Sequence, residues 1–277
     1  MALPAPTFDH VVVNARDQLD EAHAAYTALG FTLTPRGRHS LGSTNHLAIF
    51  GTDYLELLGQ SPGTARPDMV DDPIGLNGLV FGTEDSTAVY QALAAAGVPV
   101  APPNEFTRPV DLGDGTARDA TFRTVQIQPG AERPGRLYFC HHFTRDLVWR
   151  DEWRQHANGT TGIVRAVIAS IDPSLLGGLF ARMFGGTAVR AIEGGVRLTV
   201  GVQAIDVLNT GEAARQLGDA AADAGGRAHY MVALTLRTRG LAMVRTALDA
   251  SGVTAMADEH RVLVPATAGM GCPIEFI

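Results

Sequence analysis

The order of secondary-structure signals repeats four times along the chain, and this repeat constrains the fold more than any single motif does. In the first copy, the β-branched run at 7–14 predicts a strand. The next segment has apolar residues at helical spacing between Asp17, a suitable N-cap, and Gly30, a suitable C-cap, so it predicts a helix. Three further strands are predicted at 31–34, 46–50 and 54–58. A chain with such a repeat is expected to fold as copies of one βαβββ module.

Three more copies of this module follow. The predicted strand, helix and three strands of the second copy lie at 79–83, 85–96, 98–100, 121–127 and 137–140. Those of the third copy lie at 163–171, 173–184, 188–192, 196–200 and 204–208, and those of the fourth at 230–236, 241–250, 253–255, 261–264 and 274–277. One module leaves a face of its sheet open, whereas two paired modules can curve around an interior cleft.

We therefore predict an α+β fold in which four tandem βαβββ modules form two paired-module domains, 1–150 and 151–277. The boundary is placed within 145–162, a polar stretch that contains the turn signal Asn158-Gly159. The segment 102–118 is rich in Pro, Gly and Asp, and it predicts an extended strand and a hairpin at the mouth of the cleft.

Charge and apolar patterning exclude several classes of partner. The net charge is −7 and there is no run of Lys or Arg, which argues against nucleic acid, because phosphates need basic patches. No apolar stretch approaches the ~20 residues that span a bilayer, and the amino terminus lacks the features of a signal peptide. Cys140 and Cys272 are the only cysteines, which fits a reducing cytoplasm. We expect a cytoplasmic protein, either a monomer or a homodimer, that binds a small molecule.

Strand alternation predicts which side chains face the cleft. In the first strand, the inward residues would be Phe8, His10 and Val12, with Val11 and Val13 facing the helix. In the last strands of the first and second modules, the inward residues would be Tyr54, Glu56 and Leu58, and Tyr138, Cys140 and His142. His10, Glu56 and His142 are thereby predicted to surround one cleft.

Two imidazoles and one carboxylate are the usual ligand set of a catalytic divalent metal with open positions. His10, Glu56 and His142 therefore predict a bound divalent ion, with Zn, Ni, Mn, Fe and Mg all left open. The alternative for a lone strand histidine is packing in the core. Glu56 stands between apolar neighbours, and a buried carboxylate needs a partner or a metal. A bulge in the last strand of the second module would exchange His142 for His141.

The other modules offer no comparable ligand set. Counted back from the helix, Gly78 takes the position of His10 in the second module. In the second half, Arg165 takes that position, and Glu275 and Asp206 lie on last strands as Glu56 does. An arginine with two carboxylates is more simply a structural ion-pair cluster. We therefore expect no metal in 151–277.

Two segments resemble a known family. The first, GRHSLGSTNHLAIFGTDYLELLG at 37–59, is similar to a pattern of Gly-x-His, Gly-[Ser/Thr]-x-Asn-x-Leu and Tyr-[Leu/Ile]-Glu-Leu. The second, LYFCHHFTRDLVWRDEWRQHANGTTGI at 137–163, is similar to a junction with Phe-Cys-x-His, Val-Trp-Arg and His-x-Asn-Gly. Both resemble the bacterial glyoxalase-like branch of the vicinal oxygen chelate superfamily. That superfamily includes glyoxalase I, type I extradiol dioxygenases, fosfomycin-resistance transferases and bleomycin-binding proteins.

The resemblance implies that metal ligands come from the first and last strands of the paired modules, where His10, Glu56 and His142 stand. It also implies that His39 and Asn45 bind a substrate oxygen or act as acid and base. The alternative is that Asn45 caps a turn and His39 is solvated. Gly78 departs from the glyoxalase I pattern, which has a histidine there, and this argues against methylglyoxal–glutathione chemistry.

We therefore predict a metal-dependent lyase or isomerase for a small oxygenated metabolite that chelates the metal, with Glu56, His39 and Asn45 taking part in catalysis. The first alternative is a non-catalytic protein that binds a drug or metabolite. The second is an extradiol-type dioxygenase, whose metal ligands would lie in the second half, where the histidines are missing. Three inward ligands favour an enzyme, and two or fewer favour a binding protein.

Overall fold

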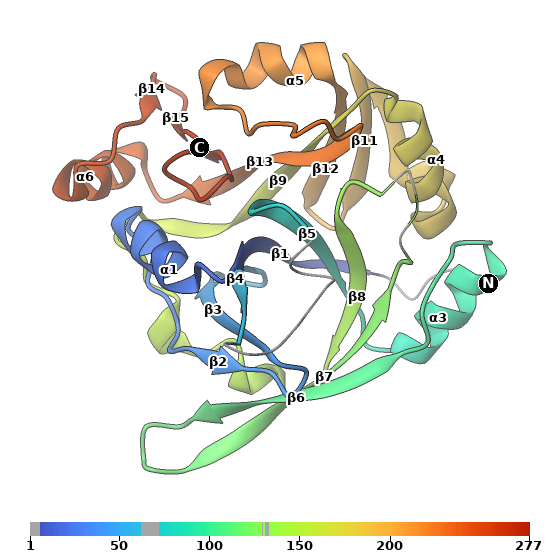
Figure 1. Ribbon diagram of the computed structural model, residues 1–277, viewed down its shortest axis with the longest axis horizontal. Helices are drawn as coiled ribbons and strands as arrows, with labels where there is room; N and C mark the ends of the chain where they lie inside the picture. The colour runs from blue at the N-terminus through green and yellow to red at the C-terminus, as the bar shows by residue number, and fades with distance from the viewer. Residues whose placement is uncertain (1–5, 62–71, 129, 131–132) are drawn as a thin grey trace.

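The computed structural model describes residues 6–61, 72–128, 130 and 133–277, and its strands form two eight-stranded sheets (Figure 1). The first sheet has the strand order β2 (Gly37–Arg38), β3 (Ser43–Ile49), β4 (Tyr54–Gln60), β1 (Thr7–Arg16), β5 (Gly75–Gly82), β8 (Arg136–His142), β7 (Ala117–Gln126) and β6 (Asn104–Asp111). The second has the order β10 (Val189–Ile192), β11 (Gly195–Val200), β12 (Gln203–Asn209), β9 (Thr160–Ser170), β13 (His229–Thr238), β16 (Ile274–Phe276), β15 (Val262–Val264) and β14 (Met256–Ala257). The predicted α+β fold of paired βαβββ modules is confirmed.

The helices are α1 (Leu19–Ala28), α3 (Ser86–Ala95), α4 (Pro173–Phe184), α5 (Thr210–Leu217) and α6 (Leu241–Ser251). Within the described residues, no helix is both long enough and apolar enough to cross a bilayer. The apolar side chains on the helix-covered faces of the two sheets merge into one continuous core. The two halves of the chain therefore share their main hydrophobic core.

Each sheet joins two modules through their first strands. In the first sheet, β1 and β5 run antiparallel, with His10 opposite Val80 and Val12 opposite Gly78. The last strand of each module lies parallel to its first strand, so that Val12 is opposite Glu56 in the pair of β1 with β4. These four central strands carry His10, Glu56 and His142.

The predicted alternation holds along most of these strands. Val11, Val13, Leu55 and Leu57 lie in the core with the helices, whereas Val12, Tyr54, Leu58, Val80 and Cys140 lie in a separate cluster on the concave face. Phe8 is an exception, because it joins the helix-side core and its ring lies 6.2 Å from that of Phe81. The register of β1 against β5 shifts between Phe8 and His10, and this bulge breaks the alternation at Phe8.

Two predicted strands that directly follow a helix, at 31–34 and 253–255, are wrong, and the one at 98–100 is reduced to a single antiparallel bridge between Val100 and Ile127. The N–H groups of Phe31, Val98 and Val253 donate to Tyr26, Leu93 and Leu248, each five residues earlier. This is the hydrogen bond of a Schellman cap, in which the apolar residue after the glycine packs back on the helix. The edge strands begin later, at Gly37, Asn104 and Met256. The predicted N-cap is also shifted, since Gln18 rather than Asp17 precedes α1 and makes no side-chain cap.

One helix was not predicted, and it fills the concave face of the second sheet. Helix α5 lies beside the second sheet (Figure 1). Its Ala213 and Leu217 pack with apolar side chains of that face. Its signal was present in the sequence, because Asn209 accepts the N–H of Glu212 as an N-cap, and a glutamate at that third position is typical of a helix start. The predicted hairpin at 102–118 is formed by β6 and β7 at one edge of the first sheet, and residues of both strands line its cavity.

A buried carboxylate connects the two halves. Asp53 accepts the N–H of Ile163 at 3.1 Å and the side-chain amide of Gln203 at 2.9 Å. Burial raises the pKa of Asp53 to about 6, although both hydrogen bonds act in the opposite direction. At neutral pH the burial of Asp53 therefore makes its charged form less stable in the folded protein than in the unfolded chain.

Asp53→Asn should remove part of the pH dependence of stability. Because the pKa of Asp53 is about 6 in the fold and 3.8 as a free side chain, the folded state binds the extra proton between these values. The contribution of Asp53 to the free energy of unfolding should thus fall as pH rises from 4 to 6, by at most about 3 kcal/mol. Urea unfolding at pH 4.5 and pH 7 should show a smaller difference for Asp53→Asn than for the wild type. Equal differences in the two proteins would contradict the assignment.

Candidate active site

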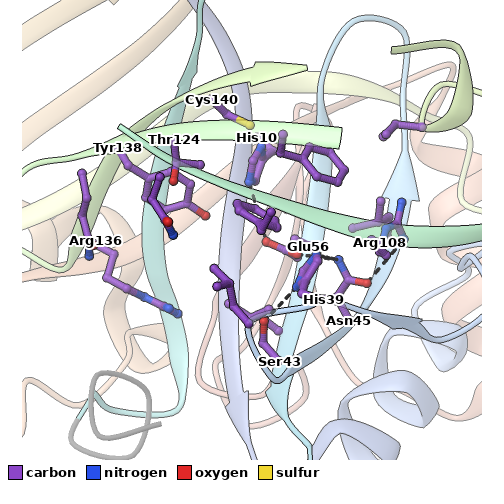
Figure 2. Close-up of a pocket in the computed structure, with 18 of the residues that line it drawn as sticks. His10, His39, Ser43, Asn45, Glu56, Arg108, Thr124, Arg136, Tyr138 and Cys140 are labelled. Carbon is purple, nitrogen blue, oxygen red and sulfur yellow. Dashed lines mark hydrogen bonds and ion pairs between the residues drawn. The ribbon is translucent and has the colours of Figure 1, made fainter. Parts of the chain in front are cut away.

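The concave face of the first sheet encloses a cavity of about 180 Å³ (Figure 2). His10 from β1 and Glu56 from β4 both line it, and their Nε2 and Oε2 atoms lie 3.7 Å apart. Both side chains are buried, with 3% and 7% of their surfaces exposed. The structure therefore brings together the two residues on which the predicted site depends.

Asp9 is a central residue of this site that sequence reasoning missed. Its Oδ2 atom accepts a hydrogen bond from Nδ1 of His10 at 2.7 Å and another from Nε2 of His142 at 2.9 Å. A carboxylate on Nδ1 places the imidazole proton there, so Nε2 of His10 presents a lone pair to the cavity. The bulge next to Asp9 is a local irregularity that strand alternation could not predict.

The pair of Asp9 and His142 is charged at neutral pH. Burial raises the pKa of Asp9, but the charge of His142 and the hydrogen bonds from His10 and His142 outweigh it and hold this pKa well below its usual range. Burial lowers the pKa of His142, but Asp9 outweighs this effect and raises the pKa to about 10. His142 is therefore a buried cation whose counter-charge is Asp9.

His142 lies behind His10 rather than beside Glu56. It faces the concave side as alternation predicts, but Phe122 and Trp149 pack against its ring at 5.1 and 5.0 Å, and it is not among the residues that line the cavity. The register of β8 is unbroken, and His141 contacts Phe143 instead of Asp9. The assignment of His142 as a third metal ligand stays a prediction.

The carboxylate oxygen of Glu56 that faces away from His10 is hydrogen-bonded to Asn45. The Nδ2 atom of Asn45 donates to Oε1 of Glu56 at 2.6 Å and lies 3.3 Å from Nε2 of His39. The Nδ1 atom of His39 is 2.8 Å from the hydroxyl of Ser43. Asn45 is buried in β3 and His39 is half-buried where the turn to Gly42 begins, and both side chains line the cavity.

Two buried arginines also line the cavity, and sequence reasoning missed both. Arg108 from β6 donates from Nη1 to Oδ1 of Asn45 at 3.4 Å, and Arg136 from β8 has Nε 3.5 Å from Oδ2 of Asp72. Arg108 is 3% exposed and Arg136 is 5% exposed. Alternation in the two strands could have placed them inward, because each lies two residues from another cavity residue, Phe106 or Tyr138.

The donor set fits a divalent metal ion in part. An imidazole and a carboxylate 3.7 Å apart can both reach one ion at bond lengths of about 2 Å. The positions that correspond to His10 and Glu56 in the second module are held by Gly78 and Tyr138. A Cβ atom on Gly78 would lie 2.7 Å from Cβ of Val12, so the close approach of β1 and β5 leaves no room for a histidine there.

A second group of donors adjoins the cavity, and one of its members, Cys140, lines the cavity. One atom each of Asp9, Cys140 and His142 lie within 4.8 Å of one another. Burial raises the pKa of Cys140, so the sulfur is a neutral thiol at pH 7, although His142 acts in the opposite direction. The thiol of Cys140 is buried in the apolar cluster of the concave face.

The corresponding place in the second sheet is occupied by an ion-pair cluster. Arg165 lies 3.2 Å from Asp206 and 3.3 Å from Glu275, and Asp206 also pairs with Arg197. Gln216 of α5 is hydrogen-bonded to Arg165 as well. Helix α5 and these ion pairs fill the face that forms a cavity in the first sheet.

A family model described as a glyoxalase-like domain matches residues 8–184, which is more than half of the chain. The chain belongs to the glyoxalase-like family. The match includes the whole of the first sheet and its cavity, and the resemblance to the vicinal oxygen chelate superfamily is thereby confirmed. No curated protein matches the chain.

Solved structures share the fold of this glyoxalase-like protein at low sequence identity. A hypothetical protein from Staphylococcus aureus has a TM-score of 0.69 and 15% identity, with 98% of this chain and 99% of that chain covered. A mutant of 4-hydroxymandelate synthase from Streptomyces coelicolor has a TM-score of 0.57 and 12% identity, with 99% and 92% covered. Homoprotocatechuate 2,3-dioxygenase from Arthrobacter globiformis has a TM-score of 0.54 and 12% identity, with 100% and 82% covered.

Proposed function

We propose that this glyoxalase-like protein is a metal-dependent lyase or isomerase that acts on a small oxygenated metabolite in the cavity of the first sheet. The observation that carries the proposal is the approach of Nε2 of His10 to Oε2 of Glu56, at 3.7 Å in a buried cavity. Because Asp9 holds the proton on Nδ1 of His10, both facing atoms are hydrogen-bond acceptors. Two buried acceptors that face each other favour a cation between them.

His10 and Glu56 would hold this ion, and substrate oxygens or water would complete its coordination. When bound, a divalent ion polarises a substrate oxygen and stabilises negative charge that develops on it. Asp9 fixes the orientation and tautomer of His10, and Asn45 fixes the carboxylate of Glu56. His39 lies beside Asn45 at the same wall, within reach of a bound substrate as a group that accepts or returns a proton.

Metal titration of the purified protein tests this proposal. The protein is first stripped with a chelator and then titrated with Zn, Ni, Mn, Fe(II) and Mg by calorimetry. We expect one ion per chain for at least one metal, and an affinity at least about 100-fold weaker in His10→Ala and Glu56→Gln. His260→Ala, which removes an exposed histidine of the second half, should bind as the wild type does. If the wild type, His10→Ala and Glu56→Gln all bound the metal equally well, the metal site would lie elsewhere in the protein.

A non-catalytic binding protein is the second candidate, and the small number of ligands favours it. His10 and Glu56 line the cavity, whereas Gly78 and Tyr138 hold the corresponding positions in the second module. Glu56 already has a hydrogen-bond partner in Asn45. This candidate predicts tight binding of small molecules by protein that takes up none of the five metals. The dioxygenase alternative predicts oxygen uptake with Fe(II) or Mn, which an oxygen electrode measures on the same samples.

A further inference from the structure

We infer that the cavity takes a small carboxylic acid with an apolar body, and that Arg108 binds its carboxylate. The inference gives the substrate class for the site of the proposed function. It rests on the proposed function only in placing the ligand in the cavity of the first sheet. The side chain of Arg108 is 97% buried in the protein, as its 3% exposure shows. Arg108 lines the cavity from β6, which is an edge strand of the first sheet (Figure 2).

Arg108 is a buried cation without an ion-pair partner among the described residues. Its hydrogen bond to Oδ1 of Asn45 is long, at 3.4 Å, and its Nε atom has no hydrogen-bond partner. Glu56 lies on the far side of the Asn45 amide, to which it is hydrogen-bonded. A buried guanidinium with unused donors is costly unless an anion pairs with it.

The chain makes specific room for this guanidinium. A Cβ atom on Gly37 would lie 2.5 Å from Cδ of Arg108, 2.7 Å from its Nη1 atom and 2.3 Å from Oδ1 of Asn45. Glycine at this position therefore allows Arg108 and Asn45 to approach each other beside the short strand β2. A planar fork of N–H donors matches the geometry of a carboxylate better than that of a single oxygen.

Arg136 lines the same cavity but differs in its pairing. Its Nε atom lies 3.5 Å from Oδ2 of Asp72, which supplies a counter-charge, although Nε and Nη2 of Arg136 have no hydrogen-bond partner. The two arginines can therefore be told apart by mutation, because Arg108 has no ion pair within 4 Å among the described residues, whereas Arg136 has one. Arg136 serves as a matched control for a buried cavity arginine.

The apolar part of the ligand is indicated by the aromatic wall next to Arg108. Phe106, two residues before Arg108, stacks on Phe122 with ring centroids 5.2 Å apart, and His39 meets Phe106 edge-on at 5.3 Å. All three side chains line the cavity. Arg108 also lines a second cavity, of about 330 Å³, but Phe106 and Phe122 do not. The first cavity thus places apolar surface and an unpaired cation together.

The test measures binding of phenylacetate and phenylpyruvate, and of the neutral phenylacetamide, to metal-stripped protein by calorimetry. We expect each carboxylate to bind at least about tenfold more tightly than the amide. Arg108→Gln should abolish this preference, Arg108→Lys should keep part of it, and Arg136→Gln should change it less than threefold. Phe106→Leu should weaken both carboxylates if they occupy the first cavity.

Several results would overturn the inference. They are equal affinity of the wild type for carboxylate and amide, an unchanged preference in Arg108→Gln, or tighter binding of phenyl phosphate than of phenylacetate. The wild-type comparison does not depend on whether a variant folds, and circular dichroism checks the folding of each variant. Since the protein is free of metal, carboxylate binding can succeed where metal uptake fails. Glu56→Gln should likewise lose the metal while keeping the preference for carboxylates.

Discussion

Asp9→Asn should lower the free energy of unfolding by about 3 kcal/mol at pH 6, because it leaves His142 as a buried cation without its counter-charge. Asp9 is 1% exposed, and the same oxygen accepts from His10 and His142. An amide oxygen in the same place can still accept both hydrogen bonds, but it carries no charge. The loss should therefore exceed that expected for a surface ion pair.

The pH dependence gives this prediction its sign. The pKa of Asp9 is lowered in the fold, so its contribution is present above the ordinary value of 3.8 and is lost as pH falls. The pKa of His142 is raised from 6.5 to about 10, so its contribution is full below 6.5 and is lost as pH rises through 10. The difference between wild type and Asp9→Asn should be largest between these limits, near pH 4 to 6.5.

Urea unfolding at pH 5, 7 and 9.5 measures this difference, and NMR of the imidazole nitrogens reports the charge of His142. In the wild type His142 should remain protonated at pH 8, whereas in Asp9→Asn it should be neutral there. Arg118 and Asp146 form an exposed ion pair at 3.4 Å, so Asp146→Asn serves as the control, with an expected loss below about 0.5 kcal/mol. A pH-independent loss in Asp9→Asn would contradict the ion-pair explanation.

Asp206→Asn should lower the free energy of unfolding by about 2–3 kcal/mol and leave ligand binding in the first half unchanged. Asp206 is 1% exposed and accepts from both Arg165 and Arg197. Both arginines are partly exposed, which limits the cost of leaving them without this partner. The cluster therefore acts on stability, because helix α5 and these ion pairs fill the concave face of the second sheet.

The two readouts separate stability from function. Unfolding is measured by urea titration, with Asp146→Asn again as the surface control, and binding by the calorimetric titrations of metal and carboxylate. A loss of metal or carboxylate binding in a folded Asp206→Asn protein would show that the second half contributes to the site. An unchanged stability would show that Arg165 and Arg197 find water or other partners at no net cost.

Much of the site could be predicted because it lies on regular strands. Alternation with period two placed His10 and Glu56 on the concave face, and their approach to 3.7 Å follows from β1 and β4 being neighbours in the sheet. The prediction failed where backbone geometry departed from this regularity. Phe8 turned to the helix side and Asp9 entered the site at the bulge in β1.

Local sequence determined the repeated module, the helix ends and the inward face of each central strand, because these depend on period, glycine positions and burial within one segment. Only the tertiary structure decided which groups meet. Asp9 with His142, Arg108 with Asn45, and α5 with the second sheet are contacts between segments far apart in sequence. Whether a buried charge has an ion pair depends on those distant contacts, so the sequence could name candidate ligands but could not show that Arg108 has no ion pair among the described residues.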